Sequence, residues 1–435
     1  YIRENGIEMV NLRYPGADGR LKTLNFIIND EEYLESILTC GERVDGSSLF
    51  PYIEAGASDL YVVPRYRTAF RNPFSEIPAV DLLCSYYTKD GTPLDMAPEQ
   101  TLRRAHEELR RATGLDFHVM GELEFYVVSP LQGLFLADDQ KGYHESTPFN
   151  KGAAFRTLAM KYIAEAGGLI KYGHSEVGNF TQGDRMYEQN EIEFLPTDLE
   201  DAADQLMVAK WIIRTLAWQQ GVDVTFAPKI TVGKAGSGLH INLSLYMDGK
   251  NLFEGDIAPD SVAGSFMAGV LAHSRELTVF TNPLPNSYQR FGCDEAPRYV
   301  SWSRQNRSQL VRIPMVKGDN CRMELRSPDP ACNPYLAIGL ILAAGLDGIE
   351  QRMVLQPPVN RNLFDAAEAK GLGLETLPAT LEEAVQVAEE SEFLRRVLPE
   401  GLSKRYFSEE LKRCAALRSA PDRAEHERVY YFNAI

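Results

Sequence analysis

The stretch Gly121-Glu122-Leu123-Glu124-Phe125-Tyr126 alternates carboxylates with apolar residues. In a β-strand, residues i and i+2 point to the same face, so Glu122 and Glu124 are expected side by side, with Leu123 and Phe125 facing a core. Two adjacent carboxylates repel each other unless a proton or a cation lies between them. The pattern therefore predicts a core strand with one charged face.

Three other predicted strands repeat this alternation of polar and apolar residues. They carry Glu191 and Glu193; His240, Asn242 and Ser244; and Arg322, Glu324 and Arg326. A half-exposed sheet with a wet face would explain any one of these strands. All four together favour a polar cavity in which carboxylates and an imidazole bind hard cations such as Mg²⁺ or Mn²⁺. Neither a Walker A nor a Rossmann phosphate motif occurs, so nucleotide binding needs other evidence.

A chain of 435 residues is too long for one ordinary core, which predicts two domains. Strands at residues 7–12, 23–28 and 59–64, a helix capped by Asp30 and the turn at 90–93 indicate a small mixed domain over residues 1–92. A larger domain is expected over residues 93–435. Its strands are predicted at 117–128, 191–194, 224–226, 240–245, 310–313 and 322–326, and its helices at 99–111, 155–166, 199–220, 262–280 and 334–352.

Charge is distributed unevenly along the chain. The net charge of −16 argues against nucleic acid as a partner. From Arg290 to Arg326, however, seven arginines and one lysine stand against four acids. Arginine favours bidentate binding of carboxylate or phosphate, although ion pairs between domains or subunits would explain the same composition.

No segment predicts a membrane or a secreted protein. The longest apolar stretch, residues 334–346, is too short to span a bilayer, and no signal peptide is visible at the start. The six cysteines form no C-x-x-C pair, so neither a zinc knuckle nor a disulfide framework is indicated. These features favour a cytoplasmic protein without membrane partners.

Several short segments follow one another in a specific order along the chain. They are Asp45-Gly46-Ser47-Ser48, Gly121-Glu122-Leu123-Glu124-Phe125, His174-Ser175-Glu176-Val177, Gln189-Asn190-Glu191-Ile192, Gly236-Ser237-Gly238-Leu239-His240, Asn286-Ser287-Tyr288-Gln289-Arg290 and Arg322-Met323-Glu324-Leu325-Arg326. In this order the segments resemble the glutamine synthetases, specifically the bacterial type I class, nearly end to end. The resemblance implies an α+β fold, with a small β-grasp-like N-terminal domain followed by a large catalytic domain whose curved antiparallel sheet is flanked by helices.

The resemblance also implies an activity: ATP-dependent ligation of ammonium to the γ-carboxylate of L-glutamate. The reaction passes through γ-glutamyl phosphate and gives glutamine, ADP and phosphate. ATP is a co-substrate, and two to three Mg²⁺ or Mn²⁺ ions are expected per active site. Members of this class are dodecamers of two stacked hexameric rings with active sites shared between subunits.

Matching positions carry implied roles for the metals and the substrates. One metal is expected on Glu124, Glu176 and Glu191, and a second on Glu122, His240 and Glu324. Contacts to glutamate and to the transferred phosphoryl group are implied for Glu124, Gly236, His240, Arg290, Arg307 and Arg326, with Arg307 in a catalytic role. Nucleotide contacts are implied for Asn242, Ser244, Arg312 and Arg322.

The amine side has its own implied residues. Asp45 matches the aspartate that binds and deprotonates ammonium, and Ser48 and Tyr143 flank that site. Asp45 is expected to come from the neighbouring subunit. Glu295 matches the flap glutamate that closes over the intermediate and shields it from water.

The sequence departs from the family pattern at several positions. Ala235 replaces an asparagine before the Gly-Ser-Gly, Asn242 replaces a second histidine, Lys171 replaces a glutamate, and residues 178–188 are an insertion beside the amine site. The flap before Glu295 is one residue shorter than usual. Two alternatives follow: a γ-glutamyl ligase for methylamine, ethanolamine or a polyamine, and a non-catalytic regulatory homologue.

Overall fold

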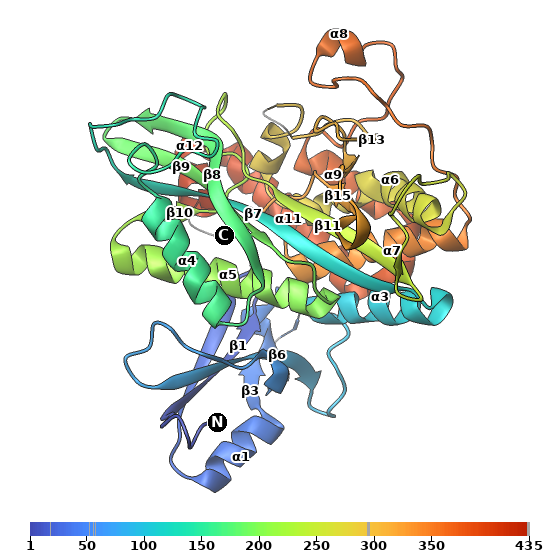
Figure 1. The fold of residues 1–435 in the computed structure, drawn as a ribbon. Coiled ribbons are helices and arrows are strands. Elements are labelled where there is room, and N and C mark those ends of the chain that lie inside the picture. The colour runs from blue at the N-terminus through green and yellow to red at the C-terminus, as the bar shows by residue number, and fades with distance from the viewer. Residues whose placement is uncertain (18, 52, 55, 57, 294–295, 433–435) are drawn as a thin grey trace.

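The computed structural model describes residues 1–17, 19–51, 53–54, 56, 58–293 and 296–432. The N-terminal part folds around one mixed sheet, below the rest of the chain in Figure 1, with strand order β2-β1-β6-β4-β3 and β5 on β6. Strand β1 pairs parallel with β6 and antiparallel with β2. Its elements are β1 (Met9–Pro15), β2 (Leu21–Ile27), α1 (Glu31–Cys40), β3 (Glu42–Asp45), α2 (Gly46–Leu49), β4 (Asp59–Pro64), β5 (Phe70–Arg71) and β6 (Ala79–Thr88).

Local signals set the ends of two early helices as predicted. The Asp30 carboxylate accepts a hydrogen bond from the Tyr33 backbone N–H at 2.7 Å, which caps α1. Helix α3 (Pro98–Thr113) ends where Gly114 adopts a left-handed conformation with φ 68°. It follows β6 and leads into the catalytic sheet.

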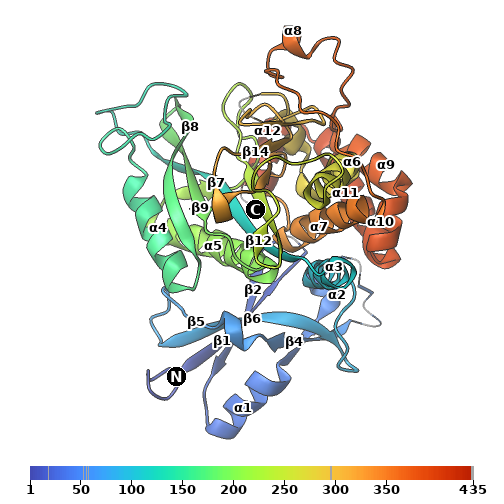
Figure 2. The same ribbon diagram turned by 45° about the vertical axis from the view of Figure 1, so that its right-hand side comes forward.

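The second sheet has strand order β13-β14-β15-β11-β7-β9-β8, with β10 on β7 and β12 on β11. All of its pairs are antiparallel except β13 with β14, which is parallel. The long strand β7 (Asp116–Pro130) runs through its middle (Figures 1 and 2). The other strands are β8 (Ile170–Gln182), β9 (Arg185–Phe194), β10 (Asp223–Thr225), β11 (Leu239–Met247), β12 (Lys250–Asn251), β13 (Trp302–Arg304), β14 (Val311–Ile313) and β15 (Met323–Leu325).

The sequence missed part of this sheet. Strand β8 was not predicted, and β9 begins at Arg185, six residues before the predicted start. In the N-terminal sheet, strand β6 was not predicted either. Residues 178–188, predicted as an insertion, extend the hairpin of β8 and β9 through a tight turn at Gly183. Alternation is hard to recognise in β8 and β9 because both faces of these two strands carry polar residues.

Helices cover the catalytic sheet and complete the large core. Helix α5 (Leu199–Gln220) matches the predicted range, and α7 (Pro334–Glu350) is buried over most of its length, which explains its almost continuous apolar sequence. The others are α4 (Ala153–Glu165), α6 (Val262–Thr281), α8 (Ala366–Ala369), α9 (Leu381–Glu390), α10 (Glu392–Val397), α11 (Glu400–Ser419) and α12 (Arg423–Glu427). Among the described residues, no helix is both long and apolar enough to cross a bilayer.

The N-terminal sheet docks on α5 through ion pairs and aromatic rings. Arg65 donates two 2.7 Å hydrogen bonds to Asp204, and the Tyr335 hydroxyl also contacts this carboxylate. Phe70 and Phe74 pack against Trp211 with ring centroids 6.1 and 5.5 Å away. Bidentate pairing and ring packing hold the two sheets in one fixed arrangement.

Candidate active site

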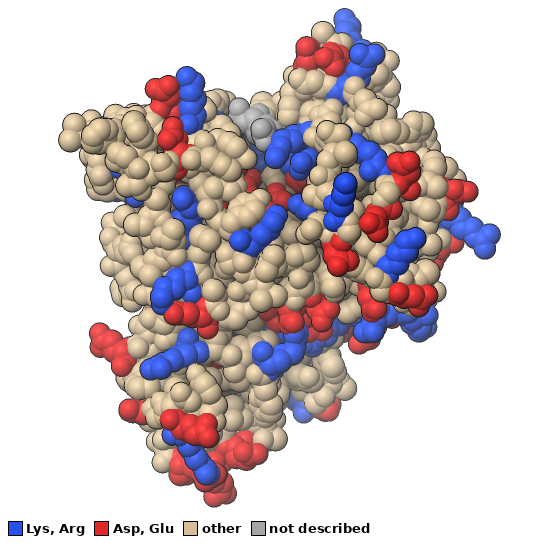
Figure 3. All heavy atoms as spheres, viewed as in Figure 1, with Lys and Arg blue, Asp and Glu red and all other residues tan. Residues whose placement is uncertain are grey.

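A cavity of about 730 Å³ opens between the polar face of the catalytic sheet and the segment that carries the arginines. Figure 3 shows basic side chains around a recess on this face, with acidic atoms visible inside it. Eleven of the residues implied by the resemblance line it. They are Glu122, Glu124, Tyr143, Glu176, Glu191, Gly236, His240, Arg290, Arg307, Arg312 and Arg322.

Strand register brings the acids together across the sheet. Glu122 on β7 stands opposite Glu193 on one side and His240 on the other, and Glu124 stands opposite Glu191. These residues are buried. Because residues that face each other across a strand pair share one face, the register concentrates four carboxylates and an imidazole at the cavity floor.

Glu122, His240 and Glu324 offer ligand atoms that all lie within 4.8 Å of one another, which groups the residues expected for the second metal. His240 Nδ1 lies 3.0 Å from Glu122 Oε2. Glu324 is fully buried, and its two oxygens accept hydrogen bonds from Arg326 and from Arg312. Burial alone would raise the pKa of Glu324, but Arg326, His240 and Arg312 lower it to about 2, so the carboxylate stays ionised.

The residues expected for the first metal are arranged differently. Glu176 and Glu191 group with His174 within 4.8 Å, a histidine to which the sequence had given no role. Glu124 lies beside them, and its Oε2 accepts hydrogen bonds from Gln189 Nε2 at 3.0 Å and from the Gly238 backbone N–H at 2.8 Å. The alternation of His174 and Glu176 would have indicated this role, had β8 been predicted.

The glycine loop before β11 approaches the arginines very closely. A Cβ atom at Gly238 would stand 2.6 Å from Arg290 Nη2 and 2.7 Å from His240 Nε2, and one at Gly236 would stand 2.5 Å from the Pro228 carbonyl oxygen. Arg290 is itself buried and donates to the Ser327 carbonyl at 2.8 Å. Only glycine fits at position 236, where the clash is with backbone, and a side chain at position 238 would displace Arg290 or His240. The loop backbone at Gly236 forms part of the cavity wall.

Comparison with known proteins decides the family. Residues 95–429 match the glutamine synthetase catalytic domain, and residues 6–89 match the glutamine synthetase β-grasp domain. The chain belongs to the glutamine synthetase family. The glutamine synthetase of Clostridium saccharobutylicum is 34% identical over 420 residues, which cover 94% of this chain and 92% of that relative. That of Methanococcus voltae is 30% identical over 433 residues, covering 97% and 95%.

Solved structures agree with this assignment. A GmaS/ADP complex has a TM-score of 0.82 and 25% sequence identity, covering 98% of this chain and 97% of that one. Plasmodium falciparum glutamine synthetase has a TM-score of 0.83 over 99% and 96% of the two chains, at 20% identity, and shows the shared fold. Glutamine synthetases use ATP and divalent metal ions, and the carboxylate and histidine groups described above could hold such ions.

Ala235, where glutamine synthetases usually have asparagine, contributes through its backbone. Its N–H donates to Gln140 Oε1 at 2.7 Å, and its carbonyl oxygen accepts from the Tyr126 hydroxyl at 2.8 Å. Gln189 Nε2 donates a hydrogen bond of 2.9 Å to the carbonyl oxygen of the following residue, Gly236. Gln140 and Gln189 therefore position the glycine loop, a role that local sequence pattern could not reveal because Gln140 lies 95 residues from Ala235.

Two residues expected on the nucleotide side lie behind the cavity wall. Asn242 Nδ2 donates to Glu122 Oε1 at 3.0 Å, and its Oδ1 accepts from Arg322 Nε at 2.8 Å. The buried Ser244 hydroxyl donates to the Cys321 carbonyl oxygen at 3.0 Å. Neither is among the described residues that line the cavity. Asn242 thus links a carboxylate of the sheet to an arginine that does line it.

Two residues expected on the amine side, Asp45 and Ser48, are not among the described residues that line this cavity. They lie at the end of β3 and in α2, on the N-terminal sheet. In Figure 1 the helices α3 and α5 separate β3 from the cavity strands. The expected flap residue Glu295 lies outside the described residues. One chain by itself therefore does not bring Asp45 to the acids of β7 and β9.

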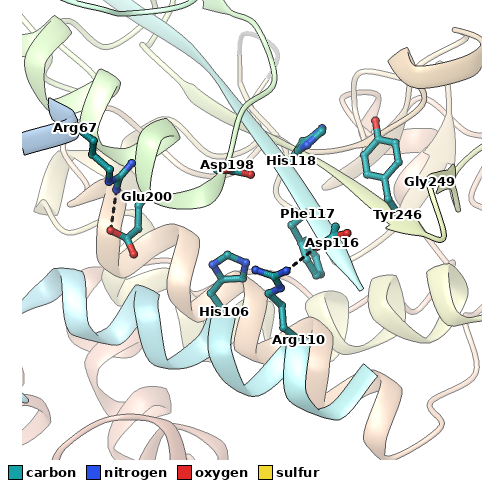
Figure 4. Close-up of a pocket in the computed structure, with 10 residues that line it drawn as sticks. All are labelled: Arg67, His106, Arg110, Asp116, Phe117, His118, Asp198, Glu200, Tyr246 and Gly249. Atoms are coloured by element: carbon teal, nitrogen blue, oxygen red, sulfur yellow. Dashed lines mark hydrogen bonds and ion pairs between the residues drawn. The ribbon is translucent and has the colours of Figure 1, made fainter. Parts of the chain in front are cut away.

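A second hollow of about 430 Å³ lies beside α3, near one end of β7 and of β11 (Figure 4). Four of its charged groups form two ion pairs: Arg67 Nη2 lies 2.9 Å from Glu200 Oε2, and Arg110 Nη2 lies 3.4 Å from Asp116 Oδ1. None of the predicted site residues is among its described lining residues. We interpret it as part of the domain boundary, where ion pairs are expected.

Metal affinity is expected to rise as the pH rises towards about 8, the pKa of Glu124, because a metal ligand must first lose its proton. Burial, and then the charge of Glu176, raise the pKa of Glu124 to about 8, and burial followed by the neighbouring carboxylates raises the pKa of Glu191 as well. Calorimetric titration with Mn²⁺ in two buffers of different ionisation enthalpy should show that metal binding releases protons, and that this release decreases as the pH rises and the two carboxyl groups lose their protons before the metal is added. A pH-independent affinity without proton release would contradict this expectation.

Proposed function

We propose that this member of the glutamine synthetase family joins ammonium to the γ-carboxylate of L-glutamate with cleavage of ATP to ADP and phosphate. The observation that carries the proposal is a single cavity in which two groups of carboxylates and histidines face arginines. Such a cavity suits a reaction that gathers negative charge. The GmaS neighbour was solved with ADP, which supports nucleotide use in the same fold.

The first step makes a leaving group. A γ-carboxylate oxygen of glutamate attacks the γ-phosphorus of ATP, ADP departs, and an acyl phosphate forms. Divalent cations bound by the two groups would neutralise the charge of the phosphoryl group during transfer. Arg290 and Arg307 line the cavity and would hold the glutamate carboxylate and the phosphoryl oxygens, while Arg312 and Arg322 would contact the nucleotide.

The second step needs ammonia as a nucleophile. Ammonium must be bound as a cation and must then give up a proton, which is a role for a carboxylate. The hydroxyls of Ser48 and Ser47 hold the pKa of the Asp45 carboxyl well below its usual range, so it is ionised and available to a cation. Ammonia would then attack the acyl carbon, and phosphate would leave.

We infer that Asp45 is supplied by a neighbouring subunit of a homo-oligomer, which we propose to be a dodecamer of two hexameric rings. The position of Asp45 on the N-terminal sheet, away from the cavity of its own chain, supports this inference. We also propose a domain boundary at residues 92 and 93, between the end of β6 and the start of α3. The six free cysteines support the prediction of a cytoplasmic protein.

A second candidate acceptor is an organic amine. The cavity mouth carries a row of aromatic rings: Tyr143 stacks on His144 at 4.2 Å, His144 lies 4.5 Å from His174, and Tyr172 lies 5.8 Å from His174. All four line the cavity. Aromatic faces attract alkylammonium groups, so this wall would suit methylamine, ethanolamine or a polyamine.

A panel of amines separates these candidates. Phosphate release is measured with ATP, Mg²⁺ and glutamate while ammonium, methylamine, ethanolamine and a diamine are supplied one at a time, and each product is identified by mass spectrometry. We expect kcat/KM for ammonium to exceed that for the others by about tenfold or more. A preference for an organic amine would overturn the assignment to ammonium, and no turnover with any amine in a normally assembled oligomer would indicate a non-catalytic homologue.

A further inference from the structure

Strand β8, which forms part of the cavity wall, contains an irregularity close to its start, centred on Lys171. Ile170 pairs with Phe194 and Tyr172 pairs with Glu193, so Lys171 is the extra residue of a β-bulge. Consecutive residues of a regular strand point to opposite faces, but a bulge redirects a side chain. Here it allows the side chains of Lys171 and Tyr172, which are neighbours in sequence, to reach the same carboxylate.

That carboxylate is Glu193. Lys171 Nζ lies 2.6 Å from Glu193 Oε2, and the Tyr172 hydroxyl donates to Glu193 Oε1, so each oxygen has its own donor. The Lys171 ammonium also lies 4.7 Å from the centre of the Tyr172 ring. Glu193 is buried, whereas the Lys171 side chain keeps 31% of its surface exposed and lines the cavity. A charge-assisted bond of this length holds both partners in place.

Glu193 belongs to a third group of possible metal ligands. Ligand atoms of Glu122, Glu191 and Glu193 lie within 4.8 Å of one another. Glu122 is shared with the group of His240 and Glu324, and Glu191 is shared with the group of His174 and Glu176. Glu193 is the only one of these three carboxylates that belongs to no other group of described residues. The partners of the Glu193 carboxylate therefore decide whether the third group can bind an ion.

We propose that the Lys171 ammonium takes the place of a third divalent cation by neutralising Glu193, so that this chain binds two tight metal ions per active site and not three. Lys171 is then a positioning residue with a fixed charge. A dication close to the Lys171 ammonium would meet electrostatic repulsion in a partly buried site. The inference narrows the expectation of two to three ions and rests on the proposed metal chemistry, but it does not depend on the acceptor amine.

The test counts bound Mn²⁺ by electron paramagnetic resonance of the free ion, with the purified full-length oligomer and without nucleotide or glutamate. Wild type is expected to bind two ions tightly per chain. Lys171→Met, which keeps the length of the side chain and removes its charge, should tighten a third site by about tenfold to a hundredfold. Lys171→Arg keeps the positive charge and should bind two Mn²⁺ ions tightly per chain, as wild type does.

Two further variants make the result decisive. Lys161→Met removes an exposed lysine of α4 that pairs with Glu165 on the same helix, and should leave the count at two. Glu193→Gln should also leave it at two, because Glu193 is not a ligand in the wild type, and it should abolish the gain when combined with Lys171→Met. The proposal is overturned if wild type already binds three ions tightly, if Lys171→Met changes nothing, or if Glu193→Gln alone loses an ion.

These outcomes separate the inference from the proposed function. Two tight ions in wild type and a third in Lys171→Met, in an enzyme that prefers an organic amine, would uphold the role of Lys171 and reject ammonium as the substrate. Ammonium-dependent turnover together with three tight ions in wild type would support ammonium as the substrate and reject the proposed role of Lys171. If Lys171→Met assembles poorly, a wild-type count of three tight ions or the loss of an ion in Glu193→Gln still overturns the proposal.

Discussion

Glu324→Gln is expected to lower turnover by about a thousandfold and Mn²⁺ affinity by about tenfold to a hundredfold. The carboxylate is fully buried, lies in the group with Glu122 and His240, and is kept ionised by Arg312 and Arg326. Glutamine keeps the shape of the side chain and removes the charge that a cation needs. Steady-state kinetics and Mn²⁺ titration measure the two effects separately.

This substitution should also reduce stability, because it leaves the buried Arg326 without its carboxylate. Breaking a buried ion pair costs about 3–5 kcal/mol, and the remaining bond from Arg326 Nε to the Arg307 carbonyl oxygen reduces that cost here. Glu200→Gln is the matched control: Glu200 accepts hydrogen bonds from Arg67 and Arg103 at the domain boundary. It should lose stability without losing metal affinity. If Glu324→Gln binds Mn²⁺ as wild type does, Glu324 is not a metal ligand.

Asp45→Asn is expected to lower amine-dependent product formation by about 10²- to 10⁴-fold, the range that a general base contributes. Asparagine cannot balance the charge of ammonium or accept its proton. Slow glutamate-dependent cleavage of ATP without amine should continue, because the metal and glutamate residues are untouched. Assays of ADP and of glutamine in parallel distinguish the two half-reactions.

Asp59→Asn is the control for Asp45. It stands opposite Asp45 in the register of β3 and β4, is similarly exposed, and pairs with Arg43. Its loss should leave both half-reactions unchanged. Equal losses of ATP cleavage and product formation in Asp45→Asn would argue against a role on the amine side.

Sharing of active sites between subunits can be tested with the same two variants. When Glu324→Gln and Asp45→Asn chains assemble together in equal amounts, about one quarter of shared sites combine an intact Glu324 with an intact Asp45 from the neighbour. Activity should therefore reappear in the mixture although each variant is inactive by itself. Complementation would fail if each chain used its own Asp45.

The sequence by itself determined the family and much of the local structure. The alternation around Glu122 and Glu124 correctly placed both on the polar face of a core strand, and Asp30 and Gly114 correctly marked helix ends. These features depend on residues a few positions apart, where strand periodicity and capping act. The order of the motifs along the chain was sufficient to indicate the two domains that the family models match.

Only the tertiary structure decided which of these residues meet. Register between strands distant in sequence set Glu122 opposite both Glu193 and His240. The packing of the chain buried the Ser244 hydroxyl against the Cys321 carbonyl oxygen and left Asp45 outside the cavity of its own chain. Lys171, which departs from the family pattern, lies in a bulge of β8 and forms an ion pair with Glu193. Pairing and register depend on long-range hydrogen bonds and on packing of the whole sheet, which no local pattern of residues contains.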